Sequence, residues 1–317
     1  MLGCSLELLM TLILARASAE FILQVTDRLV TNKQTKQPFD KVANKNILYF
    51  ASNAVVAIAY TGDAYLADVP TDHWIAEKLA GMEIDPENPP ANLFGQIKPR
   101  RDVGQAFRFL RDELARQNQR KQLDLLISVQ GWQWNSKGRL RPLVSYITKA
   151  PPQNTFFIHY EPRDWYLKGT QTISAPKANM SDKELTDLSN HLRYKSATEA
   201  EVLLVDKIRE ISQCNDWVGP HCMSILLPPP SNPNISVHYY PGNPFTLSEK
   251  QKLADEQHIW AYSPWIVSPS LCRPPCQITG GGFTARTGPF SIQFASHTPQ
   301  HPEWLLADFG QKRRKRP

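Results

Sequence analysis

The chain has 317 residues, of which 41% are hydrophobic and 21% charged, a composition that fits a globular protein and excludes a fibrous or low-complexity chain. The formal net charge is +6, but five basic residues at 312–316 supply most of it, so the body gives no reason to expect a nucleic-acid partner. No apolar run is long enough for a membrane helix, and an odd number of cysteines argues against a disulfide framework, so we expect a cytoplasmic protein without a membrane segment.

The first predicted element is a β-hairpin. It has an apolar run at 11–17 and a return run at 21–25 rich in residues that suit a pleated surface. Thr11 stands at its start and Asp27 just after its end. Met10 is a second candidate for the initiator, and its removal would expose Thr11. The threonine hydroxyl and its own α-amine could then act as nucleophile and base.

A second predicted hairpin joins strands at 47–51 and 54–60. Both runs are nearly all apolar, so we expect them to be buried on both faces. Thr61-Gly62-Asp63 ends the second strand. Helices are predicted at 72–79 and 103–120, and the arginines of the longer helix are interpreted as a solvated face.

The middle of the chain predicts strands and then a pair of helices. The strands lie at 123–129, 142–148 and 155–160, with a shorter pair at 165–167 and 171–173. The two helices begin at capping boxes, Ser181 with Glu184 and Thr198 with Glu201. Strands at 223–227 and 235–240 follow.

The last part of the chain is less regular. A helix at 248–257 and a hairpin within 276–294 are predicted, and the basic tail is expected to be disordered. Cys272 and Cys276 have a spacing that zinc tolerates, but no second Cys/His pair accompanies them. We therefore expect neither a metal nor another cofactor.

This order of elements predicts the fold class and the domain organisation. Antiparallel strands with helices grouped in pairs indicate an α+β protein, a four-layer α-β-β-α sandwich of two antiparallel sheets flanked by helix pairs. The expected organisation is an N-terminal extension at 1–10, the sandwich at 11–240, an irregular extension at 241–309 and the tail at 310–317.

Four motifs in this order resemble a known superfamily. They are the hairpin that begins with threonine, the Asp-Arg pair at 27–28, the Lys-Val pair at 41–42, and Thr-Gly-Asp at 61–63 before a helix. Over about residues 11–227, the chain resembles the proteasome β-subunit branch of the N-terminal nucleophile (Ntn) hydrolases. The resemblance implies an Ntn-hydrolase-like fold that cleaves an amide or peptide bond. It also implies a peptide or small amide substrate, a homo-oligomer and a separate ATPase as a candidate partner.

The resemblance also implies catalytic roles for individual residues. Thr11 matches the nucleophile, and Asp27 matches the aspartate that orients the site. Lys41 matches the lysine that lowers the proton affinity of the threonine, although its linker is shorter than in the family, and Lys45 is a rival for the role.

Two further positions follow from the same resemblance. Gly62 matches the glycine whose backbone N–H polarises the scissile carbonyl, and Asp216 matches an aspartate near the nucleophile. The chain departs from the family at Ser174-Ala175-Pro176 and at Val218-Gly219, where hydroxyls that support the amine are missing. Two hypotheses therefore stand: a threonine hydrolase, or a catalytically inactive Ntn-fold protein that acts as a binding or assembly module.

Overall fold

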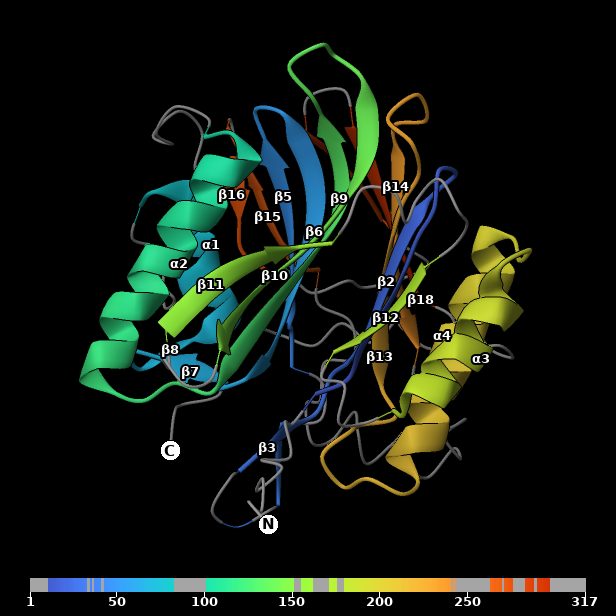
Figure 1. Cartoon of the computed structure of the whole chain (residues 1–317), viewed down its shortest axis with the longest axis horizontal. Coiled ribbons are helices and arrows are strands. Elements are labelled where there is room, and N and C mark those ends of the chain that lie inside the picture. Colours follow the sequence, from blue (N-terminus) through green and yellow to red (C-terminus); the bar gives the residue numbers. More distant parts are fainter. Residues whose placement is uncertain are drawn as a thin grey trace.

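The fold is described from a computed structural model. It describes residues 11–32, 35, 37–40, 43–82, 101–150, 155–161, 171–175, 180–240, 242, 263–269, 271–275, 283–287 and 290–296. Over these residues the chain forms two seven-stranded sheets, two small two-stranded sheets and four helices, so it is an α+β protein as predicted (Figure 1).

The first large sheet is built around the N-terminal hairpin. Its strands, in spatial order, are β12 (Gln171–Ala175), β1 (Ile13–Ala17), β2 (Ile22–Asp27), β13 (Cys222–Leu227), β14 (Asn234–Tyr240), β18 (Phe290–Ser296) and β17 (Phe283–Thr287). The predicted β1–β2 hairpin is confirmed, with Ile13 opposite Thr26. This register leaves Thr11 and Asp27 together at the open end of the hairpin.

The second large sheet is built around the second predicted hairpin. Its strands, in spatial order, are β11 (Thr155–Tyr160), β10 (Leu140–Ala150), β9 (Leu125–Trp134), β6 (Ala54–Gly62), β5 (Asn46–Ala51), β15 (Trp265–Ser268) and β16 (Leu271–Arg273). Every residue of β5 and β6 is buried, as their apolar sequences predicted. The small sheets pair β3 (Val30–Thr31) with β4 (Pro38–Asp40), and β7 (Tyr65–Leu66) with β8 (Val69–Pro70).

The prediction of two antiparallel sheets was wrong at two strand pairs. β14 pairs with β18 in parallel, and β15 pairs with β5 in parallel. Both exceptions involve strands from the last part of the chain. These strands reach the sheets by long connections, which can deliver a strand in either direction, whereas a tight hairpin imposes antiparallel pairing. The two sheets are therefore mixed.

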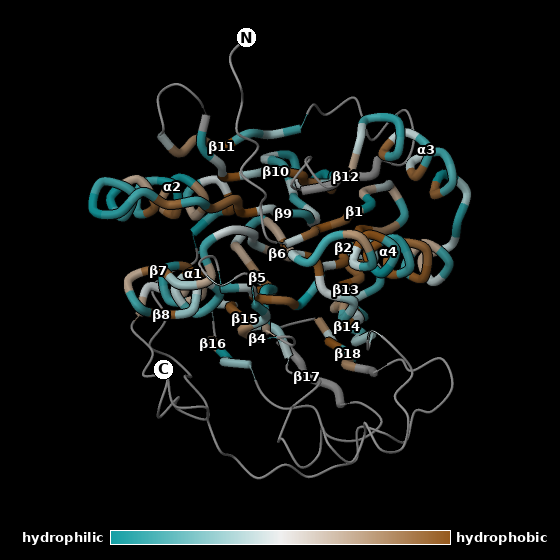
Figure 2. Tube along the Cα trace, turned by 90° about the horizontal axis from the view of Figure 1, so that it is seen from below, coloured by the Kyte–Doolittle hydropathy of each residue, from teal (hydrophilic) through white to brown (hydrophobic). Residues whose placement is uncertain are grey.

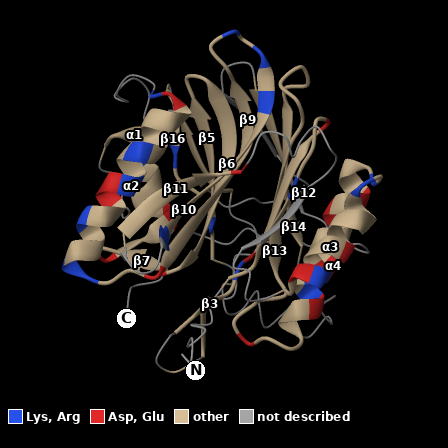
Figure 3. Ribbon diagram, viewed as in Figure 1, with Lys and Arg blue, Asp and Glu red and all other residues tan. Residues whose placement is uncertain are grey.

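Helices cover the outer faces of the two sheets. α1 (Thr71–Ala80) and α2 (Val103–Arg120) share an apolar cluster with the β5–β6–β9 side, and α3 (Asp182–Leu192) and α4 (Ala197–Ser212) share one with β1 and β2. A third cluster fills the space between the sheets. Apolar segments accordingly lie toward the middle of the molecule in Figure 2, and Figure 3 shows the charged side chains gathered on the helices.

One helix start was predicted correctly and one was wrong. Ser181 and Glu184 form the predicted capping box of α3. For α4, the capping box consists of Ser196 and Glu199, two residues before the predicted one. The overlapping sequence Ser-Ala-Thr-Glu-Ala-Glu offers both solutions, and the earlier start turns Glu201 inward, where it contacts Ser224 and His238.

Several predicted elements lie outside the described residues: the strand at 165–167, the helix at 248–257 and the tail at 310–317. The strand predicted at 171–173 is present as β12, beside β1. Within the described part of the chain, no helix is both long and apolar enough to cross a membrane.

Candidate functional site

The hairpin register brings Thr11 and Asp27 together. Because Ile13 pairs with Thr26, the residue before Ile13 lies opposite Asp27. The backbone N–H of Leu12 donates to Oδ1 of Asp27 at 2.8 Å, and the N–H of Asp27 donates to the carbonyl of Leu12 at 3.1 Å. Both Thr11 and Asp27 are buried.

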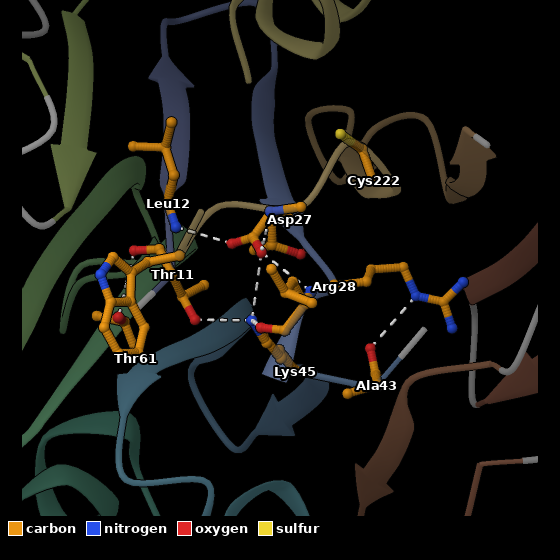
Figure 4. A network of polar contacts seen from close by, with 12 residues as sticks. Thr11, Leu12, Asp27, Arg28, Ala43, Lys45, Thr61 and Cys222 are labelled. Carbon is orange, nitrogen blue, oxygen red and sulfur yellow. Dashed lines mark hydrogen bonds and ion pairs between the residues drawn. The ribbon is translucent and has the colours of Figure 1, made fainter. Parts of the chain in front are cut away.

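Lys45 is the lysine that the structure places beside Thr11. Its Nζ lies 2.7 Å from Oγ1 of Thr11 and 3.5 Å from Oδ2 of Asp27, and it also donates to the carbonyl of Leu29 (Figure 4). Lys45 directly precedes β5 and is buried. Lys41, the other lysine considered from the sequence, lies outside the described residues.

Backbone groups surround the carboxylate of Asp27. Its Oδ2 accepts from the N–H of Leu29 at 3.0 Å and from the N–H of Gly219 at 3.1 Å, in addition to Lys45. Burial raises the pKa of Asp27, and the nearby Lys45 charge and the backbone donors oppose that rise. Burial lowers the pKa of Lys45, and Asp27 opposes that change.

The partners of Lys45 define what it can do to Thr11. A carbonyl and a carboxylate can only accept hydrogen bonds, so they hold two of the N–H groups of Lys45. The threonine hydroxyl can accept or donate. A charged Lys45 therefore directs its third N–H at Oγ1. A neutral Lys45 directs its lone pair at the same hydroxyl, and the lowered pKa of Lys45 favours this neutral form.

Gly62 and Asp216 are placed differently with respect to this cluster. Gly62 ends β6 next to Thr61, whose hydroxyl donates to the carbonyl of Thr11 at 3.2 Å. Asp216 is exposed, and among the described contacts none joins it to Thr11. The segment that carries Asp216 reaches the site instead through Gly219. The catalytic roles of Gly62 and Asp216 stay predictions.

Sequence reasoning missed the groups that act through their backbone. Leu29 and Gly219 contribute a carbonyl and N–H groups, which no side-chain motif reveals. Gly219 does carry one signal, because a Cβ there would lie 2.6 Å from the Cβ of Leu29. The chain at 219 can therefore approach the site only as glycine.

Cys222 lies opposite Asp27 in the sheet but is not a second nucleophile. It is buried, and burial raises the pKa of its thiol, so the thiol stays protonated. In the described part of the chain, no group of three or more His, Cys, Asp or Glu side chains is arranged to hold a metal ion.

A second buried carboxyl, that of Asp72, lies at the start of α1. Its Oδ2 accepts from Nδ2 of Asn44 at 3.0 Å and from Nε1 of Trp265 at 3.0 Å. Burial raises the pKa of Asp72 to about 6, against the lowering effect of these hydrogen bonds and of His73. The carboxyl therefore changes its charge close to physiological pH.

The raised pKa of Asp72 predicts a pH-dependent stability. Between its ordinary pKa and about 6, the folded carboxyl keeps a proton that the unfolded chain has released. Stability should therefore fall as pH rises from about 4 to about 6.5, by about 3 kcal/mol in the free energy of unfolding, and level off above. Urea unfolding of the wild type and of Asp72→Asn across this range measures it. If the difference in unfolding free energy between the two proteins did not change with pH, the prediction would be contradicted.

The chain has structural matches at low identity. A Gly-1 mutant of Anbu from Hyphomicrobium sp. strain MC1 matches with 15% identity and a TM-score of 0.46, over 69% of this chain and 82% of that one. Anbu, the ancestral β-subunit, from Yersinia bercovieri matches with 13% identity and a TM-score of 0.44, over 68% and 81%. Anbu is a proteasome-β-like Ntn hydrolase. No protein-family model and no curated protein matches the sequence.

Proposed function

We propose that this protein is a threonine-dependent hydrolase of amide or peptide bonds, built on a four-layer Ntn-hydrolase-like sandwich, with Thr11 as its nucleophile. The observation that carries the proposal is the 2.7 Å contact between Oγ1 of Thr11 and Nζ of Lys45, held in place by the buried Asp27. A threonine hydroxyl is a weak nucleophile until a neighbouring base accepts its proton. This arrangement supplies such a neighbour.

In the proposed reaction, Oγ1 of Thr11 attacks the carbonyl carbon of the substrate, and its proton passes to a nitrogen base. Lys45 is the base in contact with Oγ1, and the α-amine of Thr11 becomes a second one once Met10 is removed. The same proton then goes to the leaving amine as the C–N bond breaks. Water hydrolyses the resulting ester and regenerates the hydroxyl.

The test is covalent labelling of a protein that begins at Thr11. In a β-lactone probe, Oγ1 would attack the ring carbonyl, the ring C–O bond would break, and the proton would end on the released hydroxyl. Intact mass and peptide mapping should find one ester on Thr11, and Thr11→Ala should lower labelling by about 10³-fold or more. Thr31→Ala, which changes another buried threonine, should label like the wild type.

The result also decides between the two hypotheses. A folded protein beginning at Thr11 that forms no ester would reject the hydrolase. The inactive binding or assembly module would then be the supported function.

A further inference from the structure

The backbone that carries Lys45 is tied down on both sides. Ahead of Lys45, the N–H of Ala43 donates to the carbonyl of Arg28 at 3.0 Å, and Nε of Arg28 donates to the carbonyl of Ala43 at 3.3 Å. After Lys45, Nδ2 of Asn46 donates to the hydroxyl of Thr26 at 2.7 Å. The side chain of Asn44 adds a link to another element. Its amide exchanges hydrogen bonds with the backbone of Asn46, at 3.3 and 3.4 Å, and its Nδ2 also donates to Oδ2 of Asp72 on α1 at 3.0 Å.

Asp72 in turn is held by the last part of the chain. Trp265 opens β15, which pairs in parallel with β5, and its indole N–H donates to the same carboxylate oxygen that Asn44 uses. Trp265 is buried, and the ring of His73 packs on it with 4.9 Å between ring centres. The indole can therefore neither reach water nor change partner without disturbing α1.

We propose that Trp265 is a positioning residue for Lys45: through Asp72 it holds the asparagine that precedes the lysine. This inference rests on the proposed function, and it assigns to the C-terminal strands a part in the Thr11 site. Without the indole N–H, Asp72 keeps the side chain of Asn44 and the backbone N–H of His73 as donors and can turn toward them. The backbone at 44–45 then loses its fixed link to α1, and the 2.7 Å contact with Thr11 is held less firmly.

The charge of Asp72 affects how firmly it holds Asn44 and Trp265. As a carboxylate it accepts two charge-assisted hydrogen bonds on one oxygen, whereas a protonated carboxyl accepts them less well. The titratable groups that interact with it are His73 on the same helix, itself 3.0 Å from Glu77, and Tyr60 on β6. Burial raises the pKa of Tyr60 well above its ordinary value, so it stays neutral. β15 contributes the uncharged Trp265.

The experiment compares two tryptophan variants. Trp265→Phe keeps an aromatic ring and removes the N–H. Trp132→Phe makes the same change at another buried indole, whose N–H donates to the carbonyl of Leu227 at 3.1 Å. We expect Trp265→Phe to lower the rate of β-lactone labelling of Thr11 about tenfold to a hundredfold. Trp132→Phe should lose comparable stability and label at the wild-type rate.

Two further measurements separate positioning from a general loss of stability. Asn44→Ala should slow labelling at least as much as Trp265→Phe, because it also removes the hydrogen bonds between Asn44 and Asn46, and the double variant should be no slower than Asn44→Ala alone. The ratio of wild-type to Asp72→Asn labelling rates should rise as pH increases through about 6. Ionisations that both proteins share cancel in this ratio. Equal rates for Trp265→Phe and the wild type, or additive effects in the double variant, would overturn the inference.

A crystal structure of Trp265→Phe decides the inference even if no protein is labelled. The expected result is a longer distance between Nζ of Lys45 and Oγ1 of Thr11. An unchanged 2.7 Å contact would overturn the positioning role. Failure of the wild type to label would instead reject the proposed hydrolase. The positioning role of Trp265 would then be decided by comparing the crystal structures of the wild type and Trp265→Phe.

Discussion

Replacing Lys45 with methionine should lower the rate of Thr11 acylation by about 10²- to 10⁴-fold, the usual contribution of a positioned proton acceptor. Methionine keeps the unbranched side chain up to Cε but has no amine to hold a proton or to donate to Oγ1. Burst-phase mass spectrometry with a β-lactone measures the rate. Because Lys45 is the lysine found 2.7 Å from the hydroxyl, Lys41→Met should retain most of the activity.

The same substitution should also destabilise the protein. Lys45→Met removes the cation nearest to Asp27 and leaves a buried carboxylate held by backbone N–H groups alone. Removing one member of a buried ion pair typically costs about 3–5 kcal/mol. Lys45→Met should be assayed only where circular dichroism shows it folded. If Lys41→Met abolished acylation and Lys45→Met did not, the proton-transfer role would belong to Lys41.

Replacing Gly62 with alanine should destabilise the fold by about 3 kcal/mol or more. Gly62 has a φ of +106°, which L side chains rarely adopt, and a Cβ there would lie 2.0 Å from the carbonyl oxygen of Asp124. That oxygen cannot easily yield, because it accepts from the N–H of Asp63 at 2.7 Å, and Oδ2 of Asp63 accepts from the N–H of Asp124. Strain and collision therefore act together.

Gly138→Ala is the matched control for Gly62→Ala. Gly138 also has a positive φ, +70°, but nothing lies within 4 Å of a Cβ built there. Gly138→Ala should lower the free energy of unfolding by about 1 kcal/mol, which is the strain of the backbone alone. Urea unfolding followed by circular dichroism measures both variants, and similar midpoints for the two would show that Asp124 moves aside.

The sequence was sufficient for the elements that depend on local periodicity. The apolar runs and the short connection of the first hairpin predicted its strands, and the register then brought Thr11 and Asp27 together. The apolar runs of β5 and β6 predicted a hairpin buried on both faces. Ser181 and Glu184 predicted the start of α3, because a capping box is complete within four residues.

The choice of lysine could not be made by counting residues. Between Asp27 and Lys45 the chain forms the small β3–β4 sheet. The number of residues in such an excursion can vary, so the number of residues between Asp27 and a lysine does not show which lysine reaches Thr11. The start of α4 could not be decided locally either. Two overlapping capping boxes compete there, and the partners of Glu201 come from β13 and β14.

The strands β15 and β16 were the largest omission, whereas the second strand of the hairpin predicted within 276–294 is present as β18, paired antiparallel with β17. Parallel pairing of β15 with β5 joins residues from opposite ends of the chain, and Trp265 reaches Asp72 only because of that pairing. No local sequence pattern around Trp265 predicts such a contact. The asparagines on either side of Lys45 were a usable signal: Asn46 is buried and Asn44 is half-buried, and amides removed from water require fixed partners.

The position of these strands has a consequence for how the protein is made. During synthesis, β5 and β14 leave the ribosome long before β15 and β18, the strands that cover their edges. The nascent chain therefore carries two open sheet edges, which are templates for aggregation and for chaperone binding. The link from Trp265 through Asp72 to the residue before Lys45 can form only after β15 has been made, so a strand made late completes the proposed site around Thr11, which is made early.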